Sequence, residues 1–164
     1  MDRGLTLLLV AAMLLAASCT AEGEVADAPG ACAVAEDARS IERSEPSPAD
    51  DLLQWAGFEA VESLDVVGSE ERCGLDAYAA VALEGDPADV DAAIEAAGFT
   101  AQPTPGLSVT QDPVDAASLD DLAGVVSSDQ ESFQNSAGET LVRMYVRGGL
   151  PDGRELLHVW AFTT

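Results

Sequence analysis

The order of apolar and polar positions predicts a strand followed by a helix in the middle of the chain. Between residues 75 and 83 apolar side chains occupy every second position, which is the period of a β-strand. After Gly85, Asp86 and Pro87 supply a helix cap and a first helical residue. Apolar residues then follow at helical spacing, and Gly98 is suited to end a helix. We therefore expect a helix between Asp86 and Gly98.

Weaker patterns predict the elements before this strand. Ser47 and Pro48 resemble a helix start, apolar residues follow, and Gly57 can end a short helix. A strand is expected within residues 58–67, because valines cluster there before Gly68.

The remainder is expected to end in two strands. Prolines make residues 100–117 mostly loop, with a short extended piece over 107–110. Ser118 and Asp121 resemble a capping box and predict a short helix through Val126, followed by a polar loop. Strands are expected over 140–147 and 155–162, joined by a Gly- and Pro-rich turn. Residues 47–164 thus predict an α+β domain, a small antiparallel sheet with helices packed on one face.

The N-terminus has the features of an export signal. Residues 5–17 form an apolar run without charge. The run fits the core of a signal peptide and is shorter than the roughly 20 residues needed to span a bilayer. Small residues then lead directly to Cys19.

The residues Leu15-Ala16-Ala17-Ser18-Cys19 resemble the lipobox of bacterial lipoprotein precursors. The resemblance implies that residues 1–18 are removed as a signal peptide and that Cys19 carries diacylglycerol. It places the mature chain on the outer side of the cell membrane, held by this lipid anchor.

The lipobox resemblance has two departures. Ala16 stands where leucine is usual, and Asp2 offsets the charge of Arg3. An ordinary secretory signal with an incidental cysteine is the alternative.

Two further cysteines remain for a disulfide. Export favours a bond between Cys32 and Cys73, with two free thiols as the alternative. No metal site is expected, because His158 is the only histidine and the cysteines lack clustered partners. Residues 19–46 lack apolar periodicity and predict an acidic, flexible tether.

Charge excludes some partners. The formal net charge is −23, and all seven basic residues are arginine. Such a chain repels nucleic acid and does not adhere to anionic lipid through a basic patch. In composition and layout the mature part resembles small uncharacterised lipoproteins of GC-rich bacteria, a resemblance that implies no activity.

The C-terminal hairpin holds the candidate binding residues. If Arg147 lies opposite Arg154, one face gathers arginines and aromatic side chains, namely Arg143, Tyr145, Arg147, His158 and Trp160. This face could bind an anionic or aromatic-containing partner. Cross-strand packing, with arginine stems covering the rings, is the alternative that we favour. A slip of one residue in register would place these side chains on opposite faces.

Candidate chemistry is sparse elsewhere in the chain. There is no nucleophile elbow, zinc-protease helix, phosphate-binding loop or dinucleotide fingerprint, so no enzyme activity and no cofactor are expected. Asp86, Asp89 and Asp91 do not have the spacing of a calcium loop and suit a helix start. We expect a protein-interaction or accessory module with an envelope protein as partner. The alternatives are a small-ligand carrier with a pocket between helix and sheet, and an envelope hydrolase built around His158.

Overall fold

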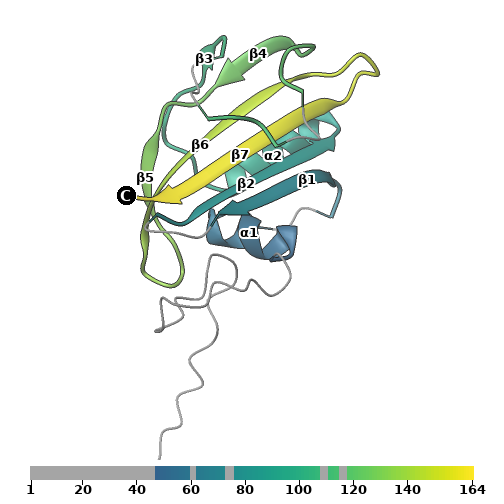
Figure 1. Cartoon of the computed structure of the whole chain (residues 1–164). Coiled ribbons are helices and arrows are strands. Elements are labelled where there is room, and N and C mark those ends of the chain that lie inside the picture. Colours follow the sequence, from purple (N-terminus) through teal and green to yellow (C-terminus); the bar gives the residue numbers. More distant parts are fainter. Residues whose placement is uncertain (1–46, 60–61, 73–75, 108–110, 115–117) are drawn as a thin grey trace, which may run out of the picture.

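The chain folds as a mixed α+β domain with an antiparallel sheet (Figure 1). The computed structural model describes residues 47–59, 62–72, 76–107, 111–114 and 118–164. Within these residues two helices and seven strands follow one another in the order α1 (Ala49–Trp55), β1 (Asp65–Arg72), β2 (Tyr78–Gly85), α2 (Pro87–Ala96), β3 (Thr104–Pro105), β4 (Ala123–Ser127), β5 (Glu131–Gln134), β6 (Thr140–Gly149) and β7 (Glu155–Thr163).

The sheet is built around the two long C-terminal strands. Its order is β1-β2-β7-β6-β4-β3, and β5 pairs with β6 beyond the end of β4. Every pair among the described strands is antiparallel. Strand β7 therefore lies between β2 and β6, where both of its edges are hydrogen-bonded.

The strongest sequence patterns are confirmed. The period of two gives β2, the two C-terminal strands are β6 and β7, and the helix after Asp86 is α2. The first helix is also present as α1, with Pro48 rather than Ser47 as its cap residue. Strand β1 begins later than expected and continues past Gly68, because its pairing with β2 resumes after a bulge between Val66 and Gly68 and runs on to Arg72.

Two expectations between α2 and β6 are wrong. The helix expected from Ser118 is absent, and β4 occupies Ala123–Ser127. The expected polar loop contains β5. Both segments pair with β6, so long-range hydrogen bonds outweigh the local capping pattern. Of the extended piece expected over 107–110, residues 108–110 lie outside the described residues, and Leu107 is not in a strand. Strand β3 comes just before it, at Thr104–Pro105.

Alternate positions of the strands divide the core into two clusters. The first cluster joins apolar residues of α1 and α2 to β2, β6 and β7, including Leu52, Leu53, Trp55, Val81, Leu83, Val90, Leu157 and Val159. Helix α1 has only seven residues, so its stability depends on this packing. Neither helix in the described part of the chain is long and apolar enough to cross a membrane.

The second cluster contains the intervening positions of the same strands. Its buried members are Tyr78, Ala80, Ala82, Val114, Met144, Val146, Leu156 and Trp160. Val114 and the partly buried Leu119 and Leu122, which come between β3 and β4 in the sequence, pack against this cluster. This cluster is therefore covered by irregular chain.

Substitution of Gly57 tests how closely the chain after α1 approaches the sheet. Gly57 has φ +80°, and an added Cβ would lie 2.8 Å from Nη1 of Arg143 and closer still to the ring of Phe133. We expect Gly57→Ala to lower the free energy of unfolding by about 2–4 kcal/mol, measured by chemical denaturation.

Gly98→Ala is the matched control. Gly98 also has positive φ, +65°, but its Cβ would meet nothing within 4 Å. Its loss should be only about 1 kcal/mol. Equal losses in the two variants would show that close approach is not what requires glycine at position 57.

Candidate functional site

The expected register of the C-terminal hairpin is wrong by three residues. Arg147 lies opposite Leu157 rather than Arg154, and Val146 lies opposite His158. Gly148 and Gly149 extend β6, and the turn closes where the N–H of Leu150 donates to the carbonyl of Arg154. An odd shift places the side chains of the two strands on opposite faces.

The five candidate binding residues are consequently separated. Tyr145 belongs to the first cluster, and Trp160 to the second. Arg143 and Tyr145 are each 2% exposed, while His158 and Trp160 are 0% exposed. Arg147, the fifth, is tied into ion pairs described below. These residues do not form one exposed binding surface, and their burial agrees with the packing alternative.

The buried guanidinium of Arg143 joins both helices to the sheet. It lies between two rings, 4.2 Å from the centre of Phe99 and 4.0 Å from that of Phe133. It donates to the carbonyls of Ala56 at 3.4 Å and Gly98 at 3.2 Å, just after α1 and α2 end. Cations are favourable at these helix ends, because carbonyls there lack partners within the helix. We call Arg143 and these partners, together with Glu131, the Arg143 hub.

Glu131 on β5 completes the hub. Its Oε1 lies 2.7 Å from Nη2 of Arg143, and its Oε2 accepts from Thr100 and from the N–H of Ala101. Burial by itself would raise the pKa of Glu131, but these donors outweigh it and hold the pKa below its usual value. Burial lowers the pKa of Arg143, and the carboxylate opposes that shift. The pair is therefore ionised and structural.

The hub also includes residues that the sequence analysis does not identify. Glu131 and Phe133 lie in the segment expected to be a polar loop. They occupy alternate positions of β5, so both side chains face the same side of the strand. A period of two, the pattern of a β-strand, is present over residues 131–134. It is hard to recognise in the sequence because Phe133 is the only apolar residue among these four.

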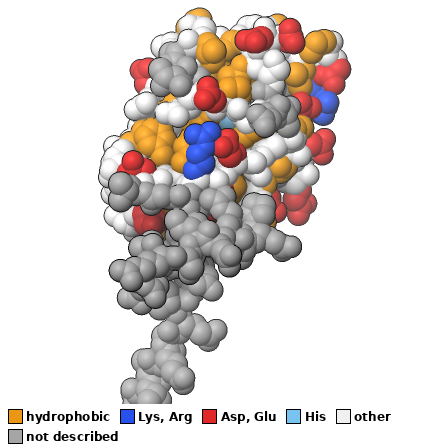
Figure 2. All heavy atoms as spheres, in the orientation of Figure 1, with side chains coloured by type: hydrophobic (Ala, Val, Ile, Leu, Met, Phe, Trp, Pro, Cys, Tyr) orange, Lys and Arg blue, Asp and Glu red, His pale blue; other side chains and the backbone are white. Residues whose placement is uncertain are grey.

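Each of the four arginines in the described residues is paired with a carboxylate. Besides Arg143, the contacts are Arg72 with Glu70 at 2.6 Å, Arg147 with Asp91 and with Glu155 at 2.7 Å, and Arg154 with Glu84 at 2.8 Å and Asp152 at 2.9 Å. Guanidinium groups engaged in this way are poorly placed to bind an anionic partner. On the face shown in Figure 2 acidic side chains are scattered widely and basic ones are sparse.

His158 and Trp160 bind the chain that covers the second cluster. Their rings stack at 3.8 Å between centres. Nε2 of His158 accepts the N–H of Val114 at 3.0 Å, and Nε1 of Trp160 donates to the carbonyl of Asp112 at 3.1 Å. Burial lowers the pKa of His158 to about 4, so the ring is neutral at pH 7. We call residues 111–114 the strap. His158 is thus committed to a backbone hydrogen bond, which gives no support to a hydrolase built around it.

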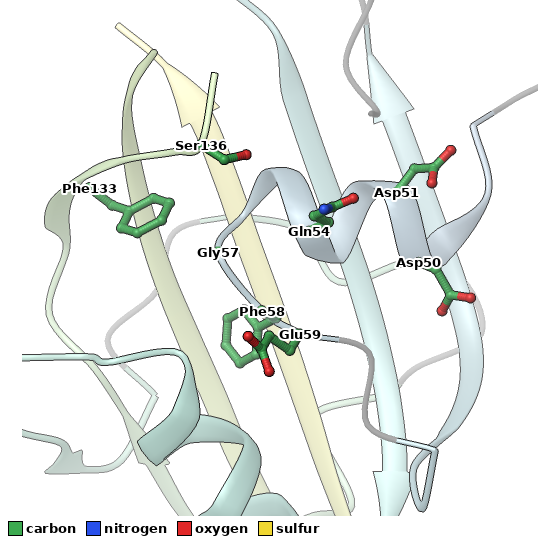
Figure 3. Close-up of a pocket in the computed structure, with 8 residues that line it drawn as sticks. All are labelled: Asp50, Asp51, Gln54, Gly57, Phe58, Glu59, Phe133 and Ser136. Carbon is green, nitrogen blue, oxygen red and sulfur yellow. The ribbon is translucent and has the colours of Figure 1, made fainter. Parts of the chain in front are cut away.

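An acidic hollow lies beside the hub (Figure 3). It has a volume of about 460 Å³ between α1, the segment after it and the β5–β6 turn. Its lining combines three carboxylates with two aromatic rings and small or polar groups, namely Asp50, Asp51, Gln54, Gly57, Phe58, Glu59, Phe133 and Ser136.

A second hollow of about 470 Å³ lies between β1 and the strap. It is lined partly by Glu70, Arg72 and Asp112. Neither hollow resembles the closed apolar pocket that a small-ligand carrier would need.

The remaining predicted sites cannot be placed in the structure. Cys19, Cys32 and Cys73 lie outside the described residues. Within the described residues, no group of three or more His, Cys, Asp or Glu side chains is arranged to hold a metal ion.

No protein family, curated protein or solved structure was found to match this chain.

Removing the charge of Glu131 tests the hub. Glu131→Gln keeps the shape but leaves the buried guanidinium without its counterion, so the free energy of unfolding should fall by about 3–5 kcal/mol at pH 7. Chemical denaturation measures the loss. The control is Glu70→Gln, which breaks the exposed pair with Arg72 and should leave stability nearly unchanged. An equally small effect at Glu131 would contradict the structural role of the hub.

Proposed function

We propose that this protein is an extracytoplasmic binding module, anchored to the outer face of the cell membrane through a diacylglyceryl group on Cys19. The lipobox-like residues 15–19 support the anchor. Two acyl chains hold a protein firmly at a membrane, whereas one does not. Residues 19–46 then separate the anchor from the domain that begins at Ser47.

The Cys32–Cys73 disulfide is part of this proposal. The N–H of Ser47 donates to Glu71 at 3.2 Å, so the start of the described domain lies beside the end of β1. Cys73 follows that strand directly in sequence, and Cys32 precedes Ser47 by fifteen residues. A connection of this length can reach about 50 Å, so the chain is long enough for the two sulfurs to meet.

We propose the acidic hollow as the binding site and a basic segment of an envelope protein as its partner. The observation that carries this proposal is the chemistry of the lining. Asp50, Asp51 and Glu59 are not ion-paired with any arginine of the described residues, and the rings of Phe58 and Phe133 line the same hollow. Carboxylates beside an aromatic ring suit a lysine or arginine side chain.

The position of the helices supports this choice of site. We propose that α1 and α2 form a layer over one face of the sheet, since their apolar residues share the first cluster with alternate residues of β2 and β7. The hollow then lies at the border of that layer, where α1 meets the β5–β6 turn. The carrier and hydrolase alternatives have less support, because the hollows are not closed and apolar and His158 is buried.

The intact mass of the protein from its own cell envelope tests the anchor and the disulfide. We expect a chain beginning at Cys19 with a diacylglyceryl adduct. We also expect a mass lower by two hydrogens, which reduction restores. An unmodified chain cut before Cys19 would indicate secretion, and one that retains residues 1–18 would indicate a cytoplasmic protein.

Binding of a fluorescent tetralysine peptide at physiological salt tests the acidic hollow. The triple variant Asp50→Asn/Asp51→Asn/Glu59→Gln should bind at least tenfold more weakly, because the carboxylates of the hollow are gone.

The matched control removes the same charge elsewhere. Asp86, Glu95 and Asp129 are exposed and lie outside the hollow. Their neutralisation to Asn, Gln and Asn should weaken binding less than threefold. Equal losses in the two triple variants would show that net charge alone attracts the peptide, and the hollow would be rejected as the site.

A further inference from the structure

We propose that His158 makes the attachment of the strap to the sheet pH-sensitive: the strap is held while the imidazole is neutral and is released when the ring takes up a second proton. This inference concerns the second cluster and is independent of the proposed anchor and acidic hollow.

The geometry identifies where the second proton must go. Nε2 of His158 accepts the N–H of Val114, so the proton of the neutral ring resides on Nδ1. Nδ1 is buried and already carries that proton. The only nitrogen that can bind another proton is therefore Nε2, the atom that holds the strap.

Protonation at Nε2 breaks this attachment. Two N–H groups would then face each other across the contact with Val114, and neither could accept. The charged ring would also be fully buried, where a cation without a counterion is unfavourable. Moving the strap away restores access to water for both N–H groups.

The charges around His158 do not replace the lost bond. Strand β6 contributes uncharged Met144 and Val146 to this side of the sheet. Among the described residues, the ionisable groups on this side are Tyr78 and Glu84 on β2, Glu70 and Arg72 on β1, Arg154 in the β6–β7 turn, Asp112 on the strap, and the exposed Asp120 and Asp121 before β4. Glu70 is paired with Arg72 and Glu84 with Arg154, while Asp112 is exposed. The dominant influence on the pKa of His158 is burial.

Release is confined to the strap. Strand β7 is hydrogen-bonded to β2 on one edge and β6 on the other, and neither set of bonds involves the imidazole. The strap is fastened by the side chain of Val114 and by the two hydrogen bonds to His158 and Trp160. Loss of one of these bonds weakens the strap without opening the sheet.

Amide hydrogen exchange of the ¹⁵N-labelled protein, followed by NMR, tests the proposal. The protection factor of the Val114 amide should fall roughly a hundredfold between pH 7 and pH 4, given a pKa of 6.5 in the released state and about 4 in the attached one. Amides of β7 that pair with β2 and β6 should keep their protection. Loss of β7 protection in the same pH range would mean global unfolding and would overturn the proposal.

Two variants separate the imidazole from the rest of the contact. His158→Gln retains a side-chain oxygen as an acceptor but takes up no proton, so the fall in Val114 protection should disappear. Trp160→Phe keeps a ring against His158 and an unchanged imidazole but loses the bond to Asp112, so the fall should persist. The same fall in His158→Gln as in the unaltered protein would refute the role of His158.

A measurement on the unaltered protein covers the case in which His158→Gln does not fold. The ring signals of His158 and the amide shift of Val114 should titrate with one midpoint. Titration of the ring without any change at Val114 would also overturn the proposal.

Discussion

A guanidinium buried at the meeting point of both helices and the sheet is the constraint on which this fold depends. A charge removed from water is strongly unfavourable unless a counterion and hydrogen bonds replace the lost solvation. Arg143 obtains the counterion from Glu131 and the hydrogen bonds from chain just beyond the two helices. The ends of α1 and α2 and the position of β5 are thereby tied to one side chain. Gly57 follows from the same requirement, because a side chain there would meet the guanidinium and the ring of Phe133.

The two sides of the sheet satisfy their buried polar groups in different ways. On the first, a charged pair is surrounded by aromatic rings and carbonyls. On the second, neutral His158 and Trp160 bind the backbone of an irregular strap. A neutral acceptor needs no counterion, but it holds its donor only while it remains unprotonated. The first arrangement is therefore insensitive to mild acid, whereas the second contains a group whose protonation opposes the native contact.

The ion pairs within the domain also determine the charge of its surface. The arginines of the described residues are engaged by neighbouring carboxylates, so the remaining acidic groups determine the charge that a partner meets. A domain of this charge, tethered as we propose, would be repelled by anionic lipid headgroups and would stand away from the membrane. The basic partner that we propose is the kind of ligand that such a surface attracts. The acidic hollow combines such carboxylates with the rings of Phe58 and Phe133.

The sequence by itself determined the features that depend on neighbours in the chain. The alternation that became β2, the cap and stop residues of α2 and the two C-terminal strands all follow from local periodicity and backbone preference. The lipobox resemblance is equally local, and it stays a prediction. Only the tertiary structure decided three features: the register of the hairpin, the formation of strand β4 where a helix was expected, and the pairing of Glu131 with Arg143. Those outcomes depend on strands that meet across long stretches of sequence, where the stability of the whole sheet outweighs the preference of any one segment.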